Sequence, residues 1–124
     1  MNDKKRKRVA PGISFGLKWS KIMIFHKTIV ALENPKYIFF MLNLKKKQLA
    51  VVASNHKTRE SFKVPEYLCE EEFEWCFKIC SQPLVSHIYE YCEWNPNTTY
   101  RIDGIVYPEQ RLVEFNLNTA TSIE

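Results

Sequence analysis

Two stretches of the sequence decide the fold: KIMIFHKTIVALENPKYIFFMLNLKKKQLAVVA (residues 21–53) and CFKICSQPLVSHIYEYCEWNPNTTYRIDGIVYPEQRLVEFNL (residues 76–117). Each contains, in the same order, a short apolar run, a helical stripe, an Asn-Pro pair, a tyrosine-led strand, a turn and a returning strand. Asn34-Pro35 and Asn95-Pro96 hold equivalent places, because the residue before a proline is pushed out of the helical region. The sequence therefore predicts two copies of one β-α-β-β unit.

The remaining segments follow from these two units. We expect a basic arm and lead-in at 1–20, a connector at 54–75 and a tail at 118–124. Within the second unit, Ser81 is placed to cap a helix, and Leu84, Ile88, Tyr91 and Cys92 have the spacing of its core-facing stripe. One unit is too small to bury both faces of its sheet, so an α+β fold is predicted, with two tandem β-α-β-β units packed about a pseudo-twofold axis as a sandwich or barrel.

Positive charge is concentrated in the first half of the chain. Residues 1–64 hold fifteen Lys and Arg against three Asp and Glu, whereas residues 65–124 hold three against eleven. The halves therefore carry +12 and −8, which gives the net charge of +4. Such asymmetry predicts a polyanionic partner for the first half, and also allows the halves of two molecules to attract each other head to tail.

The cations that we expect to bind nucleic acid fall in three places, the arm, the lead-in to the first strand and a hairpin turn. A lysine-rich turn is more often only solvated, but the three groups together favour phosphate binding because counterion release is roughly additive. Trp19 either stacks on a base or packs at a strand edge. The predicted set is Lys4, Lys5, Arg6, Lys7, Arg8, Lys18, Trp19, Lys21, Lys45, Lys46 and Lys47.

No residue pattern predicts catalysis or a cofactor. The three glycines form no phosphate-binding loop, and His26, His56 and His87 are isolated in the sequence, where a helix-cap or surface role is the expectation for His26. His87 with Cys76 and Cys80 fits no common zinc spacing, so structural thiols are favoured over a metal site. We therefore predict a non-enzymatic binding protein without metal or cofactor.

The chain lacks the apolar segments that membrane insertion and export require. Its longest apolar run, Tyr37 to Leu42, has the length of a strand, and no signal-peptide core follows the basic arm. We therefore expect a cytoplasmic protein that makes no contact with a membrane.

The two quoted stretches resemble the units of the SpoVT/AbrB-like, or swapped-hairpin, superfamily, whose MraZ-type members carry two units on one chain. The resemblance covers about two thirds of the chain and implies a swapped-hairpin-like packing and a DNA-binding regulator or antitoxin. It implies DNA contacts from basic residues near the first strand, here Lys18, Lys21 and Lys27. The usual Gly-Arg and Ile-Pro flanks are absent, since Ser20-Lys21 and Phe25-His26 stand there. The second unit offers only Lys78 near its strand.

The leading hypothesis from the sequence is a DNA-binding regulator of AbrB-like type encoded on a mobile element, because the chain also resembles small uncharacterised proteins of bacterial mobile elements. Duplex DNA is the favoured partner, bound by a monomer or a homodimer. The alternative is a protein-binding module that inhibits a host nuclease or defence complex, or acts as an assembly factor. That alternative depends on the acidic stretch at residues 70–74 and on the acidic second half.

Overall fold

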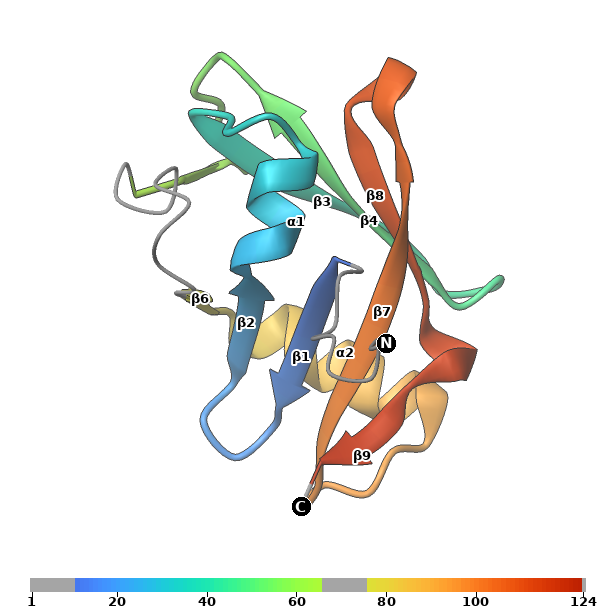
Figure 1. Cartoon of the computed structure of the whole chain (residues 1–124). Helices are drawn as coiled ribbons and strands as arrows, with labels where there is room; N and C mark the ends of the chain where they lie inside the picture. The colour runs from blue at the N-terminus through green and yellow to red at the C-terminus, as the bar shows by residue number, and fades with distance from the viewer. Residues whose placement is uncertain (1–10, 66–75, 124) are drawn as a thin grey trace, which may run out of the picture.

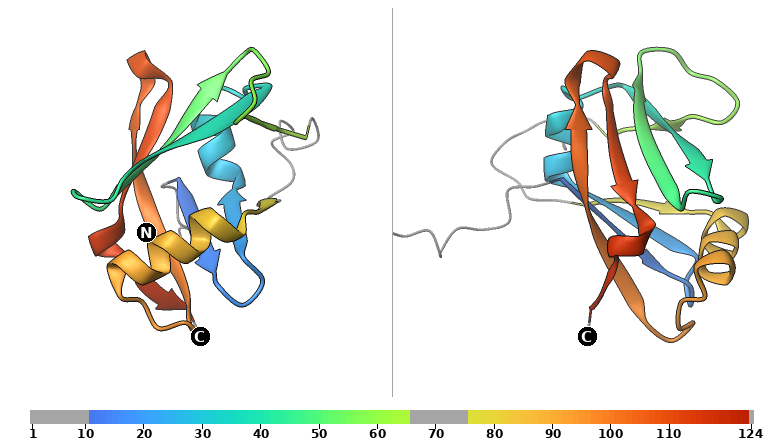
Figure 2. Two further views of the ribbon diagram at one scale, coloured as in Figure 1. Left: turned by 180° about the vertical axis from the view of Figure 1, so that it is seen from behind. Right: turned by 90° about the vertical axis from the view of Figure 1, so that its right-hand side faces the viewer.

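The computed structural model describes residues 11–65 and 76–123, and most of them belong to one antiparallel sheet (Figure 1). The sheet has nine strands in the order β5-β3-β4-β8-β7-β1-β2-β6, with β9 paired to β7. It is strongly curled into a half-barrel, so that the hairpins β3–β4 and β7–β8 cross each other at an angle (Figure 2). The described residues thus form a mostly β fold with two short helices, in which helix makes up a smaller part than the predicted α+β class implies.

The elements occur along the chain in two similar series. The first contains β1 (Gly12–Gly16), β2 (Lys21–Phe25), α1 (His26–Ala31), β3 (Tyr37–Asn43) and β4 (Gln48–Ser54). The second contains β5 (Phe62–Lys63), β6 (Cys76–Cys80), α2 (Gln82–Cys92), β7 (Thr99–Tyr107), η3 (Pro108–Gln110), β8 (Leu112–Asn116), η4 (Leu117–Thr119) and β9 (Thr121–Ile123). The predicted order of strand, helix, strand and strand is thus present in both stretches.

The two series do not form separate sheets. Within the one sheet, the pairs β3–β4 and β1–β2 of the first series alternate with strands of the second series. The hairpins β3–β4 and β7–β8 meet through β4 and β8, with Leu49 opposite Phe115 and Val52 opposite Leu112. At the other side β2 pairs with β6. This strand pairing does not show the tandem swapped-hairpin packing that the sequence predicts.

Strand β1 was not expected from the sequence, and it lies near the middle of the sheet. It pairs with β2 on one side and with β7 on the other, and all five of its residues are buried. Its inward side chains are Ile13 and Phe15, and its outward positions are Gly12, Ser14 and Gly16. The glycines weaken the strand signal in the sequence, since glycine is depleted in strands, yet they let neighbouring side chains lie over the backbone.

The core fills the inside of the curled sheet. Alternate residues of the long strands point inward, as half-buried strands require, and both helices add apolar side chains. In α2 the buried residues are Val85, Ile88 and Tyr89. Of the predicted stripe, Ile88 is buried and Leu84 and Cys92 pack half-buried against the core, whereas Tyr91 is 47% exposed. The fully buried members include Ile13, Phe15, Ile22, Ile24, Ile29, Ile38, Leu49, Val51, Val85, Ile88, Ile102, Val113 and Phe115.

Two buried hydroxyls attach the helices to the sheet. The Thr28 hydroxyl of α1 accepts a hydrogen bond from the Gly12 N–H (2.9 Å) and donates to the Gly12 carbonyl (2.8 Å). The Tyr89 hydroxyl of α2 lies within hydrogen-bond distance of the carbonyls of Phe15 (2.9 Å) and Thr98 (2.6 Å). Ser81 occupies the N-cap position of α2 as predicted, but its side chain makes no capping bond. In Figure 1, α1 follows the end of β2, and α2 lies behind β1 and β7.

No helix within residues 11–65 and 76–123 is long and apolar enough to cross a bilayer.

Candidate nucleic-acid interface

The outward face of β2 and β6 carries two lysines. Ile22 and Ile24 of β2 point into the core, which places Lys21 on the opposite face. The same alternation in β6 buries Phe77 and Ile79 and exposes Lys78. Because Lys21 is paired with Cys80 and Met23 with Lys78, the two lysines are diagonal neighbours on adjacent strands. Such positions are about 7–8 Å apart at their Cα atoms, which is a suitable spacing for two cations along one phosphate backbone.

The turn from β1 to β2 adds a third lysine and a tryptophan. The Ser20 N–H donates to the Leu17 carbonyl at 2.9 Å, which leaves Lys18 and Trp19 at the tip of the turn. Trp19 is 66% exposed, and the Lys18 Nζ lies 5.4 Å from its ring centroid. The Ser81 N–H donates to the Ser20 carbonyl at 3.0 Å, so the start of α2 holds the turn in place. Of the two alternatives for Trp19, packing at a strand edge does not fit a side chain that is largely exposed.

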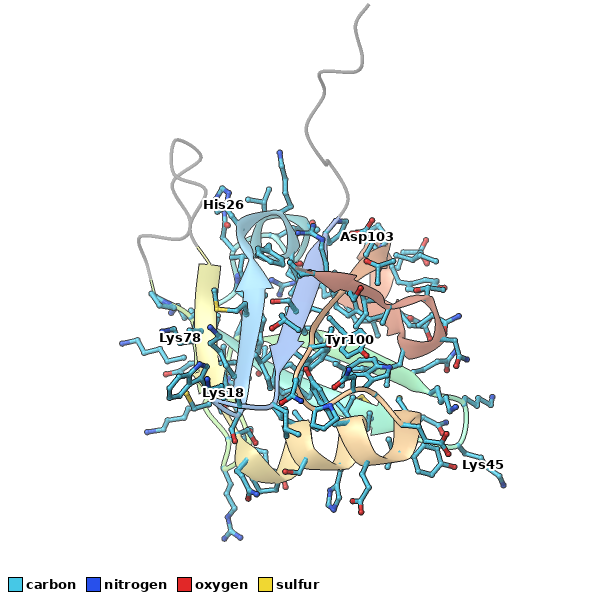
Figure 3. The ribbon with its side chains drawn as sticks, turned by 90° about the horizontal axis from the view of Figure 1, so that it is seen from below. Lys18, His26, Lys45, Lys78, Tyr100 and Asp103 are labelled. Carbon is cyan, nitrogen blue, oxygen red and sulfur yellow. The ribbon has the colours of Figure 1, made fainter. Side chains whose placement is uncertain are left out.

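The only charged residues of β1, β2 and β6 are Lys21 and Lys78. Lys78 belongs to a row of paired residues that crosses the sheet to β7. In this row Lys78 lies opposite Met23, Met23 opposite Ser14, and Ser14 opposite Arg101. We call the group Lys18, Trp19, Lys21 and Lys78 the β2–β6 cationic face, and Figure 3 shows Lys18 and Lys78 on the same side of the molecule.

Arg101 borders this face, and Gly12 is what allows its position. The Arg101 guanidinium lies over the Phe25 ring at 4.4 Å, and it crosses the backbone of β1 to reach that ring. A Cβ at Gly12 would lie 2.5 Å from Arg101 Nη2, so any larger residue would displace the guanidinium. Arg101 Nε also donates to Asp103 Oδ1 at 3.3 Å, so part of its charge is balanced. Arg101 consequently adds less positive potential than the three lysines.

The predicted lysines of the β3–β4 turn lie elsewhere. In Figure 3, Lys45 is on the opposite side of the molecule from Lys18 and Lys78. The Asn43 side chain accepts from the Lys46 N–H at 3.2 Å, and the Lys47 carbonyl accepts from the Leu117 N–H at 2.8 Å, so the turn is anchored to η4. Its positive charge acts instead on α2, where burial raises the pKa of the Cys92 thiol and Lys47 opposes that rise.

The structure thus divides the predicted residues into three groups. Lys18, Trp19 and Lys21 come together, whereas the lysine turn forms a separate surface. The basic arm lies outside the described residues, as do the acidic stretch at 70–74 and Cys69. Lys78 was absent from the predicted set, because the alternation in CFKIC shows that it points outward but does not show which strand lies beside it.

The histidines and cysteines form no recognisable reactive group in the described part of the chain. His26 is only 8% exposed and its Nε2 has no hydrogen-bond partner, so the expected cap or surface role is wrong. The His26 ring is instead buried at the start of α1, next to the core. His56 and His87 are exposed, and no three His, Cys, Asp or Glu residues among those described lie close enough to hold a metal ion.

No protein-family model matches the chain, and no significantly similar curated protein or solved structure is found. The resemblance to the swapped-hairpin superfamily therefore stays a prediction, and the function has to be argued from the surface itself.

Proposed function

We propose that this protein binds nucleic acid, with duplex DNA favoured, through the β2–β6 cationic face. The observation that carries the proposal is the pairing of β2 with β6, which brings Lys78 beside Lys21, 57 positions earlier in the sequence. Together with Lys18 in the adjacent turn, these lysines form a positive surface on strands that carry no acidic residue. Phosphate contacts of this kind fix the position of a protein on DNA but do not select a sequence.

The regulator class that we propose is AbrB-like, with two tandem β-α-β-β units. Support comes from the pairing registers. The β2–β6 pair is centred on Met23 opposite Lys78, which is the third of five residues in each strand. If Leu49 and Leu112 are equivalent, as the sequence suggests, then Leu49 opposite Phe115 and Val52 opposite Leu112 are related by the same twofold axis. In this proposal the first unit supplies most of the DNA contacts, and the second contributes Lys78 and completes the sheet.

A titration with duplex DNA at two salt concentrations tests the proposal. A protein that neutralises several phosphates loses affinity steeply as salt rises, with a slope of about 0.9 per phosphate in a plot of log K against log salt. The variant carrying both Lys21→Gln and Lys78→Gln should lower the slope by about two, because each lysine accounts for about one. Lys36→Gln, an exposed lysine between α1 and β3, is the matched control and should leave the slope unchanged.

Two outcomes would refute the proposal. The first is the absence of binding by the wild-type chain at low salt. The second is a loss of slope in the Lys36 control that is as large per lysine removed as in the double variant, because the binding would then be a property of net charge and not of this face. The first outcome would favour the alternative, an inhibitor of a host nuclease or defence complex, whose acidic stretch at 70–74 lies outside the described residues.

A further inference from the structure

The hairpins β3–β4 and β7–β8 expose an apolar surface on the side of the sheet that faces away from the core. Inward residues such as Ile38, Val51 and Val113 are fully buried, and the residues between them point outward. On this outward side Met41 is 60% exposed, Ile105 61% and Tyr107 39%. We call the outward apolar set the apolar face, and it consists of Phe39, Met41, Ala50, Val52, Ile105, Tyr107 and Leu112.

The pairing registers place these side chains in two adjacent rows across four strands. One row runs Met41, Ala50, Glu114 and Ile105, and the next runs Phe39, Val52, Leu112 and Tyr107. Glu114 is the one charged member of these two rows, and it accepts a hydrogen bond from the Tyr107 hydroxyl at 3.2 Å. A hollow of about 610 Å³ opens over part of the face, between Met41, Leu112, Tyr107 and Glu114. Contiguous exposed apolar side chains of this kind mark association surfaces.

Opposite charges stand at the two ends of the apolar face. Strands β4 and β8 are antiparallel, so the β3–β4 turn and the β7–β8 turn project from opposite ends. The first turn carries Lys45, Lys46 and Lys47. The second carries Glu109 in η3, which is exposed, and Arg111, which is half-buried and donates through its guanidinium to the Leu32 carbonyl at 3.1 Å, so Glu109 is the exposed charge at this end. If a second copy is placed face to face on a twofold axis perpendicular to the line between the turns, each lysine turn lies over the Glu109 turn of the other copy.

We propose that the apolar face is the interface of a homodimer. A twofold interface has to be self-complementary, and this surface has an apolar centre with one cationic and one acidic end, which satisfies that condition. The apolar centre supplies the association energy, and the charged ends set the orientation of the two copies. The inference is independent of nucleic-acid binding, since Lys18 and Lys78 lie on a different side of the molecule from Lys45.

Sedimentation velocity of the full chain, freed of nucleic acid, tests the interface. At about 0.1 mM protein a dimer with a micromolar Kd is largely formed. Ile105→Glu and, separately, Met41→Glu should shift the protein to monomer, because each places a charge in the apolar centre. Both residues are about 60% exposed, so the fold should tolerate either change, and circular dichroism verifies that it does. Tyr91→Glu on α2, which is 47% exposed outside the apolar face, is the control and should leave the dimer intact.

Charge exchange tests the orientation. A chain with Lys45→Glu and Lys46→Glu has two acidic ends, and a chain with Glu109→Lys has two cationic ends, so each alone should dimerise at least about tenfold more weakly at low salt. An equimolar mixture of the two should recover wild-type affinity as a heterodimer. A monomeric wild-type chain, a dimer that survives both Ile105→Glu and Met41→Glu, or a mixture no tighter than its components would each overturn the proposal.

Discussion

Replacement of Thr28 by valine should destabilise the protein much more than its small change in shape suggests. The β1–β2 register ends at Ile13 opposite Ile24, and the chain then turns into α1. Beyond that point the Thr28 hydroxyl bonds both the N–H and the carbonyl of Gly12, at 2.9 and 2.8 Å. A single side chain thereby substitutes for the backbone of a neighbouring strand.

The expected size of the effect follows from burial. Thr28 is 0% exposed, so water cannot replace its hydroxyl in Thr28→Val, and two backbone groups of Gly12 lose this partner. A buried polar group left unpaired costs about 1–3 kcal/mol, so the free energy of unfolding should fall by roughly 2–4 kcal/mol. Thr28→Ser keeps the hydroxyl and loses one methyl group, which costs about 1 kcal/mol.

Urea denaturation followed by circular dichroism measures both variants. The slope of the unfolding free energy with urea should stay constant, so that a shift in midpoint reports stability alone. A valine variant as stable as wild type, or more stable than the serine variant, would show that the hydroxyl contributes nothing and would refute this account of how β1 is held.

Two further predictions concern the core and the attachment of α2. A Cβ at Gly104 would lie 2.6 Å from side-chain atoms of Phe115 and Val113, so Gly104→Ala should lower the free energy of unfolding, measured by urea denaturation, by about 1–3 kcal/mol. Gly16→Ala is the control and should be tolerated, because its Cβ meets only the Thr99 hydroxyl at 3.6 Å. Equal effects of the two substitutions would contradict the reasoning. Burial raises the pKa of Tyr89 from 10.0 to about 12, so the contribution of Tyr89 to stability should be fully present below pH 10 and should be lost as pH rises from there to about 12, because Tyr89 ionises first in the unfolded chain. The loss is at most about 2–3 kcal/mol, and unfolding curves of Tyr89→Phe across that range should show a correspondingly smaller alkaline decline, which an unchanged decline would disprove.

Local elements were predictable where the sequence has a strong pattern. The runs KIMIF and CFKIC predict strands with the same bounds as β2 and β6. In the following hairpin the sequence predicts strands at 37–44 and 48–53, and β3 and β4 each differ from these by one residue at the C-terminal end. These segments combine β-branched and aromatic residues with clear turn signals, so local preference and the final structure agree. Strand β1 was missed because Gly12 and Gly16 dilute its pattern, although Ile13 and Phe15 alternate as a strand requires.

The candidate site was only partly predictable because its members meet through distant pairings. Lys18, Trp19 and Lys21 are close in sequence, and they stay together in the turn and the strand that follows. Lys78 joins them only because β6 lies beside β2, and periodicity alone cannot specify which strands become neighbours. Lys45 was grouped with them by charge alone, and charge in a sequence carries no information on which side of a sheet a turn will lie.

The position of β7 has a consequence for how the chain acquires its structure during synthesis. Ser14 of β1 pairs with Arg101 of β7, which lies 87 positions later, so β1 has to wait for a strand that is synthesised much later. Pairings between such distant segments form slowly, since the intervening chain has to lose its freedom before they bring any gain. A nascent chain that has not yet released β7 from the ribosome leaves the inner strand β1 with an unpaired edge. That interval is when aggregation through the strand is most favoured, and when a chaperone that shields apolar strands would be of greatest use.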